Sequence, residues 1–175
     1  LVVTPDTRGT SGGLTALRAA DGSIAWKSSW TTRNYFWGDL MADSGFLYGI
    51  TYDYYPPFGN PNPEFVKVNA ADGALVYKVV SPVVSDCPPL LLGGRLYVMG
   101  DDGRVVAFRE SDGAVEWAAS IAYFSFRDYL AASADRLYAT AGGTLKVLDP
   151  ATGAILSQSQ TSTFAGRSEE HTSEL

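Results

Sequence analysis

The chain has 175 residues, of which 46% are hydrophobic and 18% are charged, so it can bury a sizeable core and is not a disordered chain. Its net charge of −6 argues against a nucleic-acid partner, whose phosphates bind basic surfaces. No apolar run approaches the roughly 18 residues that a membrane-spanning helix needs. With 18 Gly, 9 Pro, 10 Tyr, 8 Phe and 4 Trp, the composition predicts many short strands joined by turns.

Two sequence markers recur along the chain at one period. Four segments (15–26, 67–77, 106–117 and 147–156) align without gaps around a glycine, at positions 22, 73, 113 and 153. The spacings are 51, 40 and 40 residues. A Leu-Tyr pair precedes three of these glycines, at 47–48, 96–97 and 137–138. Two markers with the same period indicate a repeat protein.

Each repeat is expected to form four short strands. In the third unit the strands are predicted at 90–92, 95–99, 104–108 and 114–118, with a five-residue loop ending at Gly113. Glycine supplies the positive φ that such a hairpin loop needs. No segment between the turns has a sustained helical period. A unit of about forty residues with four antiparallel strands is the blade of a β-propeller, so the predicted fold class is all-β.

The predicted blades divide the chain as follows. Residues 1–30 supply the last strands of one blade, and 31–80, 81–120 and 121–160 supply three more, which makes about 3.5–4 blades. Trp26 and Trp117 follow their glycines by four residues, so each places a large ring on the outer strand, where it covers the gap to the next blade. Tyr77 and Ser157 take this place in the other two repeats, and we expect packing to weaken towards the C-terminus.

The repeat pattern resembles the pyrroloquinoline-quinone-like (PQQ-like) β-propeller repeat family. The run Leu148-Asp149-Pro150-Ala151-Thr152-Gly153 is the most similar, and the resemblance covers about residues 1–160. It implies a closed ring of about seven or eight blades, of which this chain supplies roughly half. It also implies a periplasmic, cell-surface or secreted location.

Both ends of the chain are expected to be artificial. The chain begins at Leu1 without Met, in what reads as the middle of a strand. Residues 161–175 are predicted to form a disordered tail, of which 167–175 resembles a translated sequencing adapter and holds the only His of the chain. Half a ring exposes the flat faces of its first and last blades, which are expected to be rich in Val, Leu, Ile and aromatic side chains and are normally covered by the missing blades. We therefore expect poor solubility or association that completes a ring.

Three aromatic segments form the candidate binding face. The loop 52–63 is nine residues longer than its counterpart in the third repeat, and the inter-blade segments 33–39 and 123–129 are expected on the same face. Loops on a rigid scaffold and clustered aromatic side chains are typical of recognition sites. The alternative role of these rings is to fill the seams between blades. The candidate residues are Arg33, Tyr35, Trp37, Asp39, Tyr54, Tyr55, Phe58, Phe124, Arg127 and Asp128.

The leading hypothesis is a non-catalytic module that binds a protein or polymer through this face, without a cofactor or metal. One alternative is a fragment of a PQQ-dependent alcohol dehydrogenase, whose resemblance implies PQQ, calcium and an adjacent cysteine pair; here Cys87 is followed by Pro88. Three aspartates could point into the central channel (Asp39, Asp86 and Asp128), and Asp101-Asp102-Gly103 is first a turn. Another alternative is an extracytoplasmic ligand-binding or sensor domain of a larger receptor.

Overall fold

The computed structural model describes residues 1–6, 12–32, 35–36, 40–52, 63–85, 87–121, 129–141 and 143–160. These ranges contain sixteen strands and no helix, so within them no helix is available to cross a membrane. The segments predicted as a tail, 161–175, and as an adapter, 167–175, lie outside the described residues.

The strands form four antiparallel sheets, which we call blades 1 to 4 in chain order. Blade 1 comprises β1 (Val2–Asp6), β2 (Gly13–Leu17) and β3 (Ile24–Lys27). Blade 2 comprises β4 (Tyr35–Phe36), β5 (Met41–Asp43), β6 (Phe46–Tyr52), β7 (Glu64–Asn69) and β8 (Leu75–Val80). Blade 3 comprises β9 (Leu90–Leu92), β10 (Arg95–Met99), β11 (Arg104–Arg109) and β12 (Val115–Ser120). Blade 4 comprises β13 (Tyr129–Ser133), β14 (Arg136–Ala141), β15 (Thr144–Leu148) and β16 (Ile155–Gln160).

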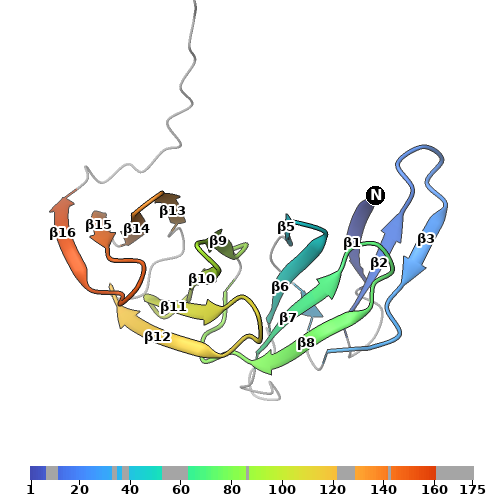
Figure 1. Ribbon diagram of the computed structural model, residues 1–175, viewed down its shortest axis with the longest axis horizontal. Helices are drawn as coiled ribbons and strands as arrows, with labels where there is room; N and C mark the ends of the chain where they lie inside the picture. The colour runs from blue at the N-terminus through green and yellow to red at the C-terminus, as the bar shows by residue number, and fades with distance from the viewer. Residues whose placement is uncertain are drawn as a thin grey trace, which may run out of the picture.

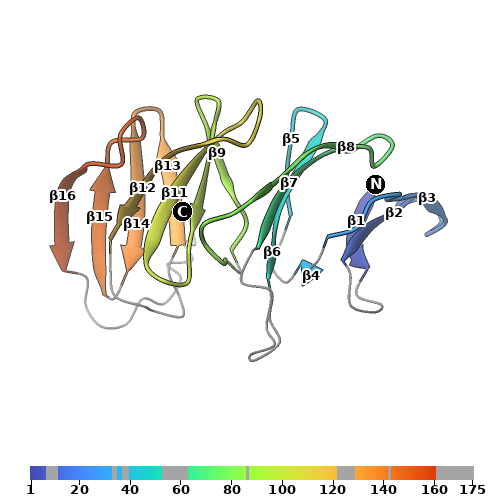
Figure 2. The same ribbon diagram turned by 90° about the horizontal axis from the view of Figure 1, so that it is seen from below.

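The blades stand side by side along an arc. Figure 1 shows β5, β9 and β13 on the inner side of the arc and β8, β12 and β16 on its outer side. Figure 2 shows that the turns between β9 and β10 and between β11 and β12 share one end of the blades. We call this the hairpin end, and the other the loop end. The prediction of four-stranded antiparallel units arranged about a common axis is confirmed, although blade 1 has three strands and blade 2 has five.

The four repeat glycines occupy equivalent turns at the hairpin end. Their φ angles are 70° at Gly22, 75° at Gly73, 74° at Gly113 and 73° at Gly153. Each N–H donates to the carbonyl four residues earlier, at 2.8–2.9 Å. Side chains rarely adopt this backbone conformation, which explains why glycine recurs at this position.

A β-bulge follows in the same place in every blade. The register between the third and fourth strand of each unit shifts between Ala16 and Leu17, Lys67 and Val68, Ala107 and Phe108, and Val147 and Leu148. The extra residue lies on the fourth strand, and beyond it the Trp or Tyr of the repeat stands opposite Ala16, Lys67 or Ala107. The bulge therefore sets which face of the sheet carries that aromatic ring.

Apolar side chains fill the three seams between successive blades. The first seam is built around Leu14, Ala16, Trp26, Leu47 and Val68. The second contains Tyr48, Phe65, Leu96 and Phe108, where the rings of Phe65 and Phe108 stack at 4.6 Å. The third contains Tyr97, Ala107, Leu137 and Leu148. The core thus consists of sheet-to-sheet layers, as in repeat proteins stabilised by neighbouring units.

An aromatic ring from each blade covers the turn glycine of the next. A Cβ added at Gly73 would lie 2.5 Å from Trp26, and one at Gly113 would lie 2.7 Å from Tyr77. Trp26 donates from Nε1 to the Ala70 carbonyl at 3.0 Å, and the Tyr77 hydroxyl donates to the Glu110 carbonyl at 3.3 Å. The prediction that outer-strand rings bridge the blades is confirmed. Tyr77 makes the same pair of contacts as tryptophan, and the expected weakening of the packing towards the C-terminus stays a prediction.

The face of blade 4 that points away from blade 3 is more polar than its counterparts. At the third seam, blade 3 presents Leu92, Met99, Trp117 and Ala119. The strand registers place Ser133, Thr140, Ser157 and Ser159 at the same positions of blade 4. All six residues of β16 are exposed. The expectation that both end faces are rich in aliphatic and aromatic side chains therefore holds only in part for blade 4.

Candidate functional site

The strand β4 joins two of the three aromatic segments at their base. Tyr35 pairs with Tyr52 and Phe36 pairs with Thr51, so these two residues of the segment 33–39 lie beside the end of β6. The long loop 52–63 begins at this point. The sequence predicted an inter-blade loop over 33–39, but two of its residues form a strand. The reason is that β5 pairs only the N-terminal half of β6, so the backbone groups of its C-terminal half need another partner.

The third aromatic segment ends at the corresponding place in blade 4. Tyr129 begins β13 and pairs with Thr140, next to the turn between β14 and β15. In blade 2, the end of β6 and the start of β7 occupy the same place. The bases of all three segments therefore lie at the loop end. Tyr129, the last residue of its segment, is 53% exposed there. The candidate residues did not include it.

Most of the candidate side chains lie outside the described residues. Of the ten, only Tyr35 falls within them, and its place is known as a position in β4. Nothing in the structure bears on the other nine candidates or on Asp86: Arg33, Trp37, Asp39, Tyr54, Tyr55, Phe58, Phe124, Arg127 and Asp128.

Buried contacts hold the base of these segments in place. Phe36 is 4% exposed, and its ring meets that of Trp30 edge-on at 6.4 Å. Thr51 is fully buried, and its hydroxyl accepts a hydrogen bond from the Glu64 N–H at 2.8 Å. The Glu64 carboxylate in turn lies 3.3 Å from the ammonium of Lys78. These contacts fix the described residues from which the segments start.

The Asp101-Asp102-Gly103 motif forms a turn between β10 and β11. Asp102 accepts a hydrogen bond from the Arg104 N–H at 3.1 Å, and its second oxygen lies 2.6 Å from the Arg104 guanidinium. This carboxylate is already engaged by a cation, so the motif does not fit a calcium site. Within the described ranges, no group of three or more His, Cys, Asp or Glu side chains could hold a metal ion.

The second seam contains an ion pair at the hairpin end. Lys67 on β7 is 6% exposed, and its ammonium contacts the Glu110 carboxylate of blade 3. The Tyr48 hydroxyl donates to the same carboxylate oxygen at 2.7 Å, and the Phe46 ring lies 4.1 Å from the ammonium. Hydrogen bonds from Lys67 and Tyr48 lower the pKa of Glu110, whereas burial and then the hydrogen bond to the Glu110 carboxylate raise the pKa of Tyr48. Glu110 is therefore a carboxylate at neutral pH and Tyr48 a phenol.

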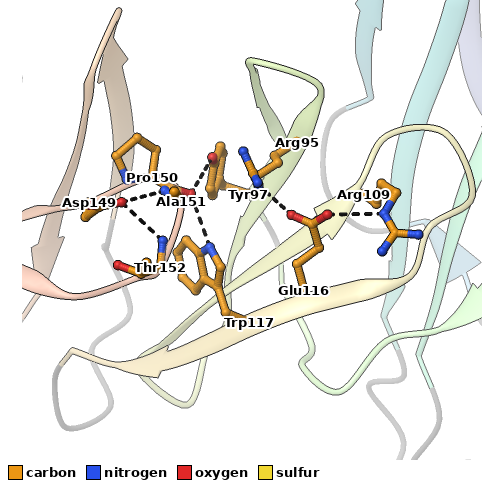
Figure 3. A network of polar contacts seen from close by, with 9 residues as sticks. All are labelled: Arg95, Tyr97, Arg109, Glu116, Trp117, Asp149, Pro150, Ala151 and Thr152. Atoms are coloured by element: carbon orange, nitrogen blue, oxygen red, sulfur yellow. Dashed lines mark hydrogen bonds and ion pairs between the residues drawn. The ribbon is translucent and has the colours of Figure 1, made fainter.

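The third seam replaces this ion pair by hydrogen bonds to one carbonyl. Figure 3 shows the Tyr97 hydroxyl and Trp117 Nε1 both directed at the Pro150 carbonyl, at 2.8 and 3.1 Å. The Asp149 carboxylate fixes the turn by accepting from the N–H groups of Ala151 and Thr152. These contacts hold a turn against a blade and leave no nucleophile beside a base. Their arrangement is structural.

A cluster of three charged side chains lies on blade 3 near this turn. Figure 3 shows the Glu116 carboxylate between two guanidinium groups, at 2.5 Å from Arg95 and 3.1 Å from Arg109. Hydrogen bonds from Arg95 and then Arg109 lower the pKa of Glu116. The group is exposed at the rim, so its contribution to stability is small.

A family model described as outer membrane protein assembly factor BamB matches residues 10–174, which is nearly the whole chain. The chain belongs to this BamB family. Its predicted similarity to PQQ-like β-propeller repeats is thereby confirmed. No curated protein matches the chain.

Two solved structures share the fold. BamB from Moraxella catarrhalis is 18% identical with a TM-score of 0.66, and the match covers 97% of this chain and 54% of that protein. The computationally designed Ika8 protein is 13% identical with a TM-score of 0.57, and the match covers 91% of this chain and 49% of Ika8. The chain thus spans about half the length of each structure. The similarity to BamB confirms the predicted β-propeller fold.

Within this BamB-family chain, sequence reasoning missed the Lys67–Glu110 pair. The signal was present in the aligned repeats: Lys67 occupies the position of Ala16, Ala107 and Val147. Glu110 occupies the position of Ala70 and Pro150, three residues before the glycine. A charge at two positions that are otherwise apolar indicates a specific partner across the seam.

Proposed function

We propose that this chain is a non-catalytic β-propeller module that binds a partner protein through the aromatic segments at its loop end. One observation carries the proposal: the β4–β6 pairing and the start of β13 bring the bases of all three segments to the same end of the blades. Aromatic side chains concentrate at the centres of protein interfaces, because they bury large areas with few rotatable bonds.

The family description supports a partner in outer-membrane protein assembly. We accordingly propose a periplasmic, cell-surface or secreted location. The proposed binding residues are the ten candidates, with Tyr129 added because it is exposed at the base of the third segment. The module is proposed to act without PQQ or a metal, and no observation in the described part of the chain favours the dehydrogenase or receptor alternatives.

Site-specific photo-crosslinking tests this proposal. Benzoylphenylalanine replaces Tyr55 of the long segment 52–63 in one variant and Asp72 in another; Asp72 is an exposed residue of the β7–β8 turn at the hairpin end. Each purified variant is irradiated with a purified outer-membrane assembly complex from a Gram-negative bacterium. We expect crosslinks to one component from position 55 and none from position 72.

Serine variants make the same test by affinity. The triple change Tyr54→Ser, Tyr55→Ser and Phe58→Ser should weaken binding at least about tenfold, as expected for loss of aromatic anchors. Val115→Ser, on an exposed strand position next to the hairpin end of blade 3, is the control. Equal crosslinking from both positions, or unchanged affinity of the triple variant, would overturn the proposal.

A further inference from the structure

The turn between β2 and β3 is more exposed than the other three repeat turns. Every residue from 18 to 24 is exposed, including Gly22. The equivalent glycines, Gly73, Gly113 and Gly153, are buried. Figure 1 shows the β2–β3 turn at one end of the arc. The backbone of residues 21 and 22 is therefore open to water, whereas the corresponding backbone of the other turns is not.

The difference arises from the aromatic rings that cover the repeat glycines. An added Cβ at Gly73 or Gly113 would lie 2.5 or 2.7 Å from the ring of Trp26 or Tyr77. At Gly22 the same methyl group would have nothing within 4 Å in the described part of the chain. A backbone group under a packed ring reacts only after that contact opens, which has a free-energy cost. The turn of blade 1 needs no such step.

Three of the repeat turns contain the dipeptide Asp-Gly, at 21–22, 72–73 and 112–113. This dipeptide rearranges spontaneously, because glycine has no side chain to shield its backbone nitrogen. The nitrogen forms a bond to the aspartate Cγ, and the carboxyl hydroxyl leaves with the amide proton as water, which gives a five-membered succinimide. Water then adds to one of the two succinimide carbonyls. It restores aspartate or yields isoaspartate, in which the main chain runs through the β-carboxyl carbon.

The carboxylates of these three turns accept the same hydrogen bond. Asp21 accepts from the Ser23 N–H at 2.9 Å, and Asp72 and Asp112 each accept from the N–H two residues later at 3.0 Å. These bonds lower the pKa of Asp21 and of Asp112. Asp112 also lies 2.9 Å from Arg109, so Asp72 is the closer match to Asp21. Between those two turns, the cover over the glycine is the main difference.

A fourth Asp-Gly pair, Asp102-Gly103, lies in the turn between β10 and β11. Gly103 is buried, and its carbonyl accepts a hydrogen bond from the Ile121 N–H at 2.9 Å. The Asp102 carboxylate lies 2.6 Å from the Arg104 guanidinium. Both groups that must meet in the succinimide are thus restrained, and this pair serves as an internal reference.

We infer that Asp21 is a modification site, at which aspartate isomerises spontaneously to isoaspartate in the folded chain, while Asp72, Asp102 and Asp112 are protected. The product adds one atom to the main chain of the β2–β3 turn and leaves the α-carboxylate as its side group. Methyltransferases that use S-adenosylmethionine recognise this carboxylate, so the aged chain becomes a substrate for that class of enzyme. The site lies at the hairpin end and does not depend on the proposed function.

Mass spectrometry of the aged chain tests the inference. The intact chain is incubated at neutral pH and digested, and electron-transfer dissociation distinguishes isoaspartyl from aspartyl peptides. Isoaspartate at position 21 should exceed that at 72 and at 102 at least about tenfold, because only position 21 needs no local opening. In guanidinium chloride all four pairs should react at similar rates. Equal amounts at 21 and 72 in the folded chain, or an excess at 21 that persists in denaturant, would overturn the inference.

Variants of Tyr77 supply the matched control. Tyr77→Ala removes the ring over Gly113 and should raise isoaspartate at position 112 several-fold, with position 21 unchanged. Tyr77→Phe keeps the ring and should leave position 112 protected. Position 102 stays unmodified if Tyr77→Ala remains folded; if it does not, the comparison of 21 with 72 in the natural chain decides. An unchanged position 112 in folded Tyr77→Ala would also overturn the inference. Methylation by a purified protein-isoaspartate methyltransferase measures the same product independently.

Discussion

Replacing Gly153 by alanine adds a methyl group where two constraints meet. The residue has a φ of 73°, and the added Cβ would lie 2.6 Å from Cε3 of Trp117. Gly22 provides a matched control, because its φ is 70° and nothing lies within 4 Å of the same methyl group. Both glycines are in end blades. The difference between the two variants isolates the contact between blades 3 and 4.

The expected magnitudes follow from these contacts. The left-handed conformation costs alanine about 1–2 kcal/mol at either position. At Gly153 the indole must also move, which removes the hydrogen bond from Trp117 Nε1 to the Pro150 carbonyl, worth about 1 kcal/mol. Loss of the ring's contact with the turn adds about 1–2 kcal/mol of apolar burial. Gly153→Ala should therefore destabilise the chain by about 2–3 kcal/mol more than Gly22→Ala.

Urea unfolding followed by far-ultraviolet circular dichroism measures both variants. A double-mutant cycle with Trp117→Ala checks the cause: in that background the two glycine substitutions should have equal effects, because the ring is gone. Equal destabilisation in the natural background would refute the reasoning. So would a difference that persists without Trp117.

Four further predictions concern the seams. Glu110→Gln should lower the free energy of unfolding in urea by about 2–3 kcal/mol, less than for a fully buried pair because Glu110 is 29% exposed; Lys67→Met in the same chain should recover part of the loss. Because the pKa of Glu110 is lowered from 4.5, its stabilisation is complete above pH 4.5 and is lost as the pH falls through the folded-state value, so the Gln variant should show a flatter pH profile below that point. Tyr77→Phe should cost about 0.5–1 kcal/mol in the same assay, since it loses only the hydrogen bond to the Glu110 carbonyl. Ser157→Trp should change stability by less than about 0.5 kcal/mol, because no described turn lies against that position; a larger gain would show that the added ring finds a partner.

The repeat glycines were predictable from the sequence because two requirements fall on one residue. Each turn needs a positive φ, and three of the four glycines also lie under an aromatic ring. Each requirement disfavours other residues, so the glycine recurs at a constant place. The strand bounds of blade 3 were predictable from these turns. Two strands match the predicted bounds, and the other two differ by one or two residues at their ends.

Features that depend on contacts between repeats were not predictable in this way. The Lys67–Glu110 pair joins two positions 43 residues apart and occurs at one seam only, so no periodicity reveals it. The strand β4 was missed because Tyr35 and Phe36 lie in a short aromatic segment that reads as a loop. They become a strand because β6 extends past β5 and leaves backbone groups to be paired.

The ion pair of the second seam also specifies the order of the blades. A chain in which blade 2 was followed directly by blade 4 would bring Lys67 against Pro150, which offers no negative charge to a buried ammonium. A chain in which blade 1 was followed by blade 3 would bring Glu110 against Ala16 and Val3, without a cation. The glycine and aromatic contacts are interchangeable from seam to seam, whereas this pair is not. The four similar blades therefore do not pack equally well against one another in every order. This lowers the risk that neighbouring blades exchange places during folding.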